Sequence, residues 1–207
     1  MHVTPVARRF IETMAAASSF PTSTILRGLL DPRLTERMLD LLRSKGRVFD
    51  PVLHNTVNAT IVRGGEKINV IPSEVTVELD GRLLPGYTPA DMIAELRRLG
   101  GDDVEFEVIS HDPGPSEPDM GLFDTLSGIL SEADSEGIPV PLLNPAFTDA
   151  RFFSRLGIQT YGFLPMKLPA TFNFNETIHA ADERIPAEAL GFGAEAIYKA
   201  LQRFGPT

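Results

Sequence analysis

The spacing of apolar residues changes along this chain and predicts where helices give way to strands. Through residues 5–48 apolar side chains recur every three or four positions, which is typical of helices separated by short breaks. Over residues 53–63 and 73–84 the period shortens to two, as it does in strands. Gly64-Gly65 supplies a turn between these two segments. We therefore predict helices followed by an antiparallel pair of strands with one face exposed to water.

A further helix is predicted after Thr88, because Thr is a good N-cap, Pro89 suits the first helical position and Asp91 suits the first turn. Residues 104–108 alternate again and predict another strand. One more βα unit in front would complete a four-stranded sheet covered by helices on one face. The apolar positions that define these elements are Val6, Phe10, Ile11 and Met14; Leu34, Met38, Leu41 and Leu42; Val75, Val77 and Leu79; and Met92, Ile93, Leu96 and Leu99.

The proline-rich stretch 111–119 is the best boundary between domains. We predict one domain over residues 1–112 and a second over residues 113–207. In the second we expect helices at 122–136, at 148–156 and after Pro186, the last with Leu190, Ala194, Ile197 and Leu201 on one face, and a buried strand at 157–163. Few strands make this an incomplete α/β layer. Its exposed side should be apolar where further structure packs.

Composition excludes several classes of partner and chemistry. A net charge of −9 with scattered basic residues argues against nucleic acid, because phosphate binding needs clustered Lys and Arg. The chain has no Cys, which excludes disulfides, thiolate zinc sites and Cys nucleophiles, and fits a cytoplasmic protein. The chain contains no apolar run of about 18 residues, so we predict no membrane span.

Four residues are candidates for chemistry, and each also has a purely structural interpretation. His179 lies in a polar cluster before a helix, where a histidine is either a metal ligand or simply solvated. Thr148 either caps a helix or lies beside a bound anion. Arg82 is either a solvated strand residue or a bidentate carboxylate binder at the end of the sheet. Asn69 closes the turn before a strand.

An ordered set of motifs resembles one known family. The motifs are His54-Asn55-Thr56-Val57-Asn58-Ala59-Thr60, Gly64-Gly65-Glu66-Lys67-Ile68-Asn69-Val70-Ile71-Pro72, Asp80-Gly81-Arg82-Leu83-Leu84-Pro85-Gly86, Thr148-Asp149-Ala150-Arg151-Phe152-Phe153, Tyr161-Gly162-Phe163 and Ile178-His179-Ala180-Ala181-Asp182-Glu183-Arg184. In this order and spacing they resemble zinc metallopeptidases such as aminoacylase, acetylornithine deacetylase, succinyl-diaminopimelate desuccinylase and carnosinase. The resemblance runs from about residue 50 to the end and is weaker before it.

The resemblance implies an α+β lid or dimerisation domain, with an antiparallel sheet covered by helices on one face. The end of an α/β zinc-hydrolase domain would follow it. It also implies that His179 is a metal ligand and that Arg82 holds the substrate carboxylate. Asn69 would then reach a neighbouring subunit's active site, and Thr148 would contact substrate. The implied cofactor is a pair of zinc ions, the implied substrate is an N-acyl amino acid or a peptide, and the implied partner is a second copy or an N-terminal catalytic half.

The family's other metal ligands and its general base lie upstream of the lid, and no matching motif is found here. The chain offers about one zinc ligand and no catalytic residue, so we expect no hydrolysis by the chain alone. Two hypotheses remain open. The first is a C-terminal fragment of a zinc-dependent amidohydrolase, from a truncated or split enzyme. The second is a non-catalytic dimerisation or carboxylate-binding module derived from such an enzyme.

Overall fold

The computed structural model describes residues 1–101, 103–114, 117–144 and 146–204, apart from the side chains of residues 44, 45 and 175. The chain forms two compact units. The first joins Met1–Pro118 to Leu142–Ile158, and the second joins Asp119–Pro141 to Gln159–Thr207. Division into domains at residues 112 and 113 stays a prediction, because contacts within a unit do not show that a segment folds alone.

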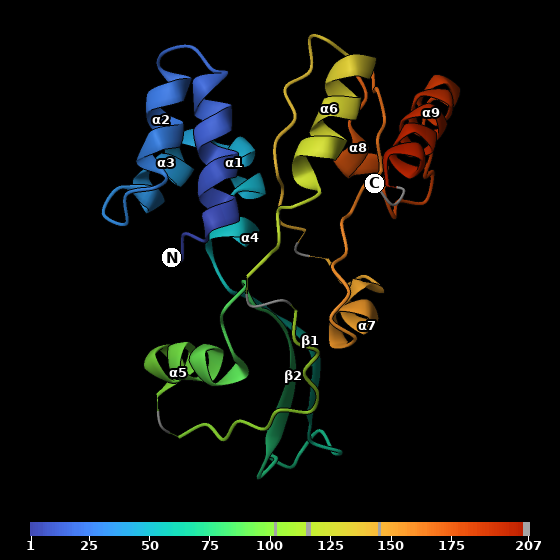
Figure 1. The fold of residues 1–207 in the computed structure, drawn as a ribbon. Coiled ribbons are helices and arrows are strands. Elements are labelled where there is room, and N and C mark those ends of the chain that lie inside the picture. Colours follow the sequence, from blue (N-terminus) through green and yellow to red (C-terminus); the bar gives the residue numbers. More distant parts are fainter. Residues whose placement is uncertain (102, 115–116, 145, 205–207) are drawn as a thin grey trace. The chain divides into compact units, whose positions relative to one another are not determined.

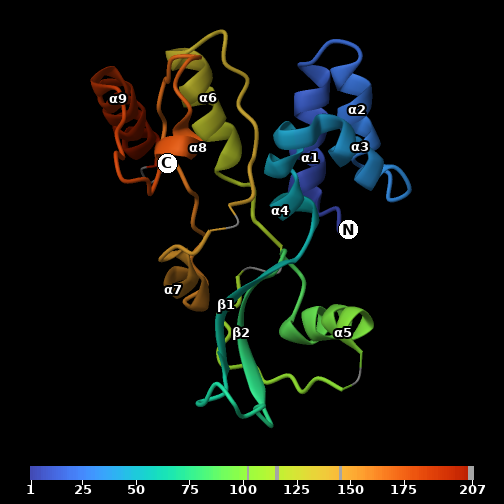
Figure 2. The ribbon, with the colours of Figure 1, turned by 180° about the vertical axis from the view of Figure 1, so that it is seen from behind.

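Short helices open the first unit, as the apolar spacing of residues 5–48 predicts (Figures 1 and 2). They are α1 (Pro5–Ala16), α2 (Thr22–Gly28), α3 (Thr35–Leu42), the 3-10 helix η1 (Arg43–Val48) and α4 (Asp50–Leu53). Helix α1 begins after Thr4, whose Oγ1 atom accepts a hydrogen bond from the Ala7 amide at 3.2 Å. Pro5 then occupies the first turn, where a missing N–H costs nothing.

Apolar side chains from these helices form the core of the first unit. Ile11, Leu29 and Leu53 are completely buried, and Val6 and Phe10 are nearly so. Each such side chain contributes about 1.5–3 kcal/mol when it is removed from water. The burial of Val6, Phe10 and Ile11 confirms the interpretation of the first apolar group.

The second apolar group of this region lies on α3 and just before it, and it is only partly buried. Leu41 in α3 is 61% exposed, and Leu34 before it is also exposed. Helix α3 instead buries Thr35, whose hydroxyl donates a hydrogen bond to the Asp31 carbonyl at 2.8 Å. Because that bond satisfies the hydroxyl, a polar side chain can be buried at this position.

The predicted strand pair is present as an antiparallel hairpin. Strand β1 (Thr56–Gly64) pairs with β2 (Val75–Arg82), from Thr56 opposite Arg82 to Gly64 opposite Val75. The register shifts between Ala59 and Ile61, which marks a bulge in β1. The confirmed hairpin therefore places Arg82 at one end and the connecting loop at the other.

Helix α5 (Pro89–Gly100) follows the hairpin and begins as predicted. Thr88 and Asp91 form a capping box, in which each side chain bonds to the other residue's amide. The helix approaches the sheet at Gly81, where a Cβ atom would lie 2.6 Å from the Met92 sulfur. A side chain at position 81 would have to displace the flexible Met92 side chain.

The burial expected for this sheet and helix is largely wrong. Val75, Val77 and Leu79 are all exposed, and Leu99 of α5 is 87% exposed, while Met92, Ile93 and Leu96 of that helix are half-buried. Helix α5 contacts this face of the hairpin at its Gly81 end. No further strand of the described residues extends the sheet beyond β1 and β2. An apolar face of the hairpin is consequently left open.

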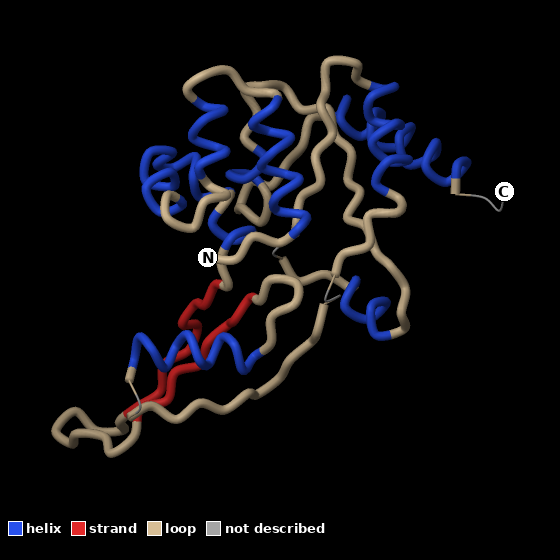
Figure 3. The backbone as a smooth tube through the Cα atoms, turned by 60° about the vertical axis from the view of Figure 1, so that its left-hand side comes forward, coloured by secondary structure: helices blue, strands red, loops and turns tan. Residues whose placement is uncertain are grey.

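The strand predicted at residues 104–108 is also not formed. Figure 3 colours only the hairpin as strand among the described residues, and these five residues have no ladder partner. Alternation favours an extended backbone, but a strand exists only where a neighbour accepts and donates the ladder hydrogen bonds. The Phe106 ring lies 5.9 Å from the Arg97 guanidinium of α5, which ties this segment to the helix instead.

The second unit is built from α6 (Phe123–Ala133), α8 (Phe174–Thr177) and α9 (Ala187–Arg203), while the short helix α7 (Ala150–Arg155) belongs to the first unit. Helices α6 and α9 are in contact, with Ile129 and Ala196 buried. An ion pair between Arg203 and Glu132 at 2.6 Å joins the two helices. These helices confirm the elements predicted near 122–136, within 148–156 and after Pro186.

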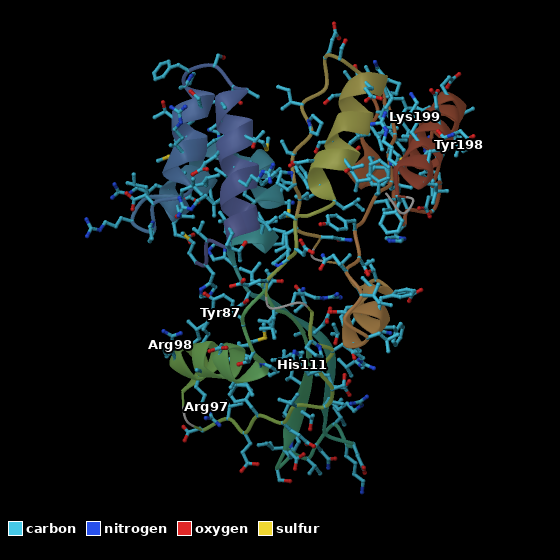
Figure 4. The ribbon with its side chains drawn as sticks, viewed as in Figure 1. Tyr87, Arg97, Arg98, His111, Tyr198 and Lys199 are labelled. Carbon is cyan, nitrogen blue, oxygen red and sulfur yellow. The ribbon has the colours of Figure 1, made fainter. Side chains whose placement is uncertain are left out.

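The strand predicted at residues 157–163 is wrong, because this described segment has no ladder partner. Its contact with the rest of the second unit is made by the Tyr161 hydroxyl, which donates to the Asp119 carbonyl and accepts from the Leu122 amide at 3.1 Å. Helix α9 leaves Leu190, Ile197, Tyr198 and Leu201 exposed by 41–69%, and Figure 4 labels Tyr198 on it. The apolar exposed side predicted for this layer is therefore confirmed.

Candidate functional site

Arg82 ends strand β2, and Asp80 holds one edge of its guanidinium group. Asp80 Oδ2 accepts hydrogen bonds from Arg82 Nε at 3.0 Å and from Nη2 at 2.7 Å. The two residues lie on the same face of the strand because they are two positions apart. Among the described residues, none accepts a hydrogen bond from Nη1. The Nη1–Nη2 edge is therefore open to a ligand.

The Phe147 ring lies against the flat face of the same guanidinium. The Arg82 Cζ atom is 4.4 Å from the ring centre, within the range of a cation–π contact. The Arg82 and Asp80 side chains are 32% and 36% exposed, so their ion pair contributes at most about 1 kcal/mol to stability. A contact of this strength adds little to the fold. It does fix the orientation of Arg82.

Arg151 shares the Phe147 ring with Arg82, and Arg155 shares the Phe152 ring with Arg151. Arg151 Cζ is 5.1 Å from the Phe147 ring centre and 4.6 Å from that of Phe152. Asp112 pairs with Arg151 at 3.1 Å and also with Arg155. Three guanidinium groups therefore face the two carboxylates of Asp80 and Asp112, which leaves a net positive charge. Such a cluster suits an anionic ligand.

Thr148 follows Phe147 directly, so the structure brings its segment to Arg82. The Thr148 Oγ1 atom accepts a hydrogen bond from the Ala150 amide at 3.3 Å, at the start of α7. This bond is a local turn interaction before the helix. The N-cap of α7 is Asp149, which makes no side-chain capping bond, so the interpretation of Thr148 as the helix cap is wrong. Contact of Thr148 with substrate stays a prediction.

Asn69 is not brought to Arg82 within one chain. It is exposed in the connection between β1 and β2, whereas Arg82 lies at the opposite end of the hairpin, opposite Thr56. The eight residues of β2 separate these ends by roughly 25 Å, at about 3.3 Å per residue. Any single site that contains both residues must take Asn69 from a second molecule.

His179 lies in the second unit, exposed in the turn after α8, with a φ of 59°. The described part of the chain contains no group of three or more His, Asp or Glu side chains that could hold a metal ion. A catalytic zinc ion takes three protein ligands. His179 and its described surroundings therefore do not fit a zinc site by themselves.

Known proteins match the chain in both of its units. Residues 7–102 match the family described as the peptidase dimerisation domain, M20_dimer. The human N-fatty-acyl-amino acid synthase/hydrolase PM20D1 is 27% identical over 202 residues, which cover 93% of this chain and 38% of that protein. Residues 7–102 therefore belong to the M20 peptidase dimerisation-domain family, and most of the chain is similar to M20 peptidases. The family resemblance of the ordered motifs is thereby confirmed.

Other M20 relatives show the same partial coverage. Succinyl-diaminopimelate desuccinylase of Magnetococcus marinus is 30% identical over 77% of this chain and 40% of its own length. Aminoacylase-1 of Sus scrofa is 26% identical over 86% of this chain and 42% of its own length. The chain thus spans about two fifths of these curated M20 relatives. No solved structure matches it.

Sequence reasoning missed Asp80 and Phe147, which contact Arg82, and Asp112, which pairs with Arg151 and Arg155. Asp80 had a usable signal, because a carboxylate two positions before an Arg in a strand lies on the same face. Phe147 and Asp112 had none, since their contacts depend on how distant segments pack. Separately, no described helix has the length and apolar character that crossing a membrane requires.

Proposed function

We propose that this chain supplies the lid of an M20 amidohydrolase, in which Arg82 binds the carboxylate of an N-acyl amino acid or dipeptide. The observation that carries the proposal is the open Nη1–Nη2 edge of Arg82, within a cluster of net positive charge. Two parallel N–H groups match the two oxygens of a carboxylate. Binding at the carboxylate would orient the acyl amide for attack.

The names of the relatives support this class of substrate. They include an N-fatty-acyl-amino acid synthase/hydrolase, an aminoacylase and a succinyl-diaminopimelate desuccinylase. All three names pair an acyl group with an amino acid. An amino-acid carboxylate is therefore the group that a shared arginine would recognise.

We further propose that His179 is one ligand of a zinc site whose other ligands come from another chain or another segment of the same protein. When bound, the zinc ions of such a site activate water and polarise the amide carbonyl. The 207-residue chain by itself then lacks both the complete site and the general base. We propose that it does not hydrolyse these substrates alone, and that it acts in the cytoplasm.

The position of Asn69 supports a homodimer as the working form. Its distance from Arg82 along the hairpin means that a partner subunit would have to supply it. The exposed apolar face of β2 and the match of residues 7–102 to a dimerisation domain support the same arrangement. The same match is equally expected under the second hypothesis, a non-catalytic dimerisation or carboxylate-binding module.

Zinc content and turnover of the purified chain test the proposal. We expect almost no zinc and no hydrolysis of N-acyl amino acids by the chain alone. Addition of an N-terminal M20 catalytic half should restore both, and His179→Ala should lower the recovered zinc. A stable dimer that no catalytic half activates would instead favour the non-catalytic module. About two zinc ions per lone chain with turnover would contradict the proposal.

A further inference from the structure

Arg82 is restrained on two sides and free on a third. Of its five N–H donors, one on Nε and one on Nη2 are taken by Asp80 Oδ2, at 3.0 and 2.7 Å. The Phe147 ring, 4.4 Å from Cζ, covers one face. We propose that Asp80 and Phe147 are positioning residues, which present the Nη1–Nη2 edge of Arg82 to a substrate carboxylate. This rests on the proposed role of Arg82.

The donors that Asp80 occupies determine which edge of the Arg82 guanidinium group a ligand can use. A guanidinium group can pair bidentately with a carboxylate through its Nε–Nη2 edge or through its Nη1–Nη2 edge. Asp80 fills the first edge, so a ligand can pair in two parallel bonds only through the second. The incoming carboxylate must therefore lie beyond the tip of Arg82, in line with its side chain.

Restraint also lowers the entropy that binding removes. An arginine side chain has several rotatable bonds, so fixing it in one conformation costs as much conformational entropy as fixing any other side chain. Because Asp80 and Phe147 order Arg82 before a ligand arrives, less freedom is lost on binding. The same contacts are too exposed to contribute much to the fold.

The charge of Asp80 acts in the opposite direction, because it repels an incoming carboxylate. Two features reduce that repulsion. The Asp80 side chain is partly exposed, so water screens it. Arg151 lies near the same Phe147 ring and adds positive charge there. We expect the gain in affinity from orienting Arg82 to exceed the loss from repulsion by Asp80. Whether Asp80→Ala weakens or strengthens carboxylate binding decides between the two effects.

The hydrogen bond itself can be measured without any ligand. In the wild-type chain the Arg82 Nε–H proton should exchange with water more slowly than in Asp80→Ala, by at least about threefold. Asp80→Asn keeps an acceptor and should recover part of the protection. Glu78→Gln is the matched control, since Glu78 pairs with Arg63 on the same strand face and should leave Arg82 unchanged. Equal exchange in wild type and Asp80→Ala would overturn the positioning role.

Titration with N-acetyl-L-methionine tests the consequence for binding. The dissociation constant should rise about three- to tenfold in Asp80→Ala and in Phe147→Leu, with partial recovery in Asp80→Asn. Unchanged or tighter binding by Asp80→Ala would overturn the proposal. If the wild-type chain binds no carboxylate, the proposed function of Arg82 fails, while a protected Nε–H proton still supports the positioning by Asp80.

Discussion

The guanidinium group of Arg82 lies 4.4 Å from the centre of the Phe147 ring. This contact joins the end of strand β2 to the segment that leads into α7, two regions far apart in the sequence. It brings the motif that contains Arg82 next to the motif that begins at Thr148. The two motifs that suggested anion binding thus belong to one place in the first unit.

The capping box of α5 predicts a local loss of stability in a Thr88 variant. Thr88 Oγ1 accepts from the Asp91 amide at 3.4 Å, and Asp91 Oδ2 accepts from the Thr88 amide at 2.8 Å. Thr88→Ala removes the first bond and should cost about 1 kcal/mol. Hydrogen exchange of the first amides of α5 measures this, and Thr88→Ser, which keeps the hydroxyl, serves as the control. Equal protection in Thr88→Ala and wild type would contradict the cap.

The ion pair between α6 and α9 predicts a dependence on acid. The hydrogen bond from Arg203, at 2.6 Å, lowers the pKa of the Glu132 carboxyl below its usual 4.5. A group whose pKa is lowered on folding stabilises the fold above its unfolded pKa, and this contribution is lost as the pH falls through the folded value. An NMR pH titration should therefore show Glu132 titrating below 4.5.

Removal of the arginine gives the control for that titration. In Arg203→Gln the Glu132 carboxyl should titrate near its usual value, and the contact between α6 and α9 should no longer weaken in this pH range. If Glu132 titrates identically in Arg203→Gln and wild type, the ion pair is not the cause.

Two glycines of α9 predict opposite responses to the same substitution. At Gly193 a Cβ atom would lie 2.6 Å from the Pro165 carbonyl oxygen, and backbone cannot easily move away. Gly193→Ala should therefore destabilise the second unit by about 1–3 kcal/mol. At Gly191 a Cβ atom would meet nothing within 4 Å, so Gly191→Ala should stabilise the helix by about 0.5–1 kcal/mol.

Urea unfolding followed by far-UV circular dichroism compares the two variants with wild type. A higher midpoint for Gly191→Ala and a lower one for Gly193→Ala are the expected results. Equal shifts in one direction would mean that α9 does not pack against Pro165.

Much of the fold follows from local sequence, as the hairpin and α5 illustrate. The alternation in β1 and β2 and the Thr88-Pro89-Asp91 start of α5 are signals carried by adjacent residues. Burial could not be read in the same way. Leu99 and Val77 have the spacing of core residues but are exposed, because a side chain is buried only when another element covers it. Residues 104–108 and 157–163 failed as strands for a similar reason, since each lacks a partner.

Some residues of the candidate site were likewise predictable from local sequence, and others were not. Arg82, Thr148 and His179 were named from motifs, and the structure places Arg82 near the segment of Thr148. Asp80 was within reach of a period-two argument. The Phe147 ring and the Asp112 carboxylate, which complete the cluster, depend on long-range packing that no local pattern encodes.

The binding of an N-acyl amino acid by Arg82 tests the central claim most directly. N-acetyl-L-methionine is titrated into the 207-residue chain and into Arg82→Gln, with Arg63→Gln as a second exposed strand arginine for control and the uncharged amide of the same compound as a control ligand. We predict that Arg82→Gln weakens binding at least about tenfold. Arg63→Gln should have no effect, and the amide should not bind. Equal binding by Arg82→Gln and wild type, or equal binding of the amide, would contradict a carboxylate site at Arg82.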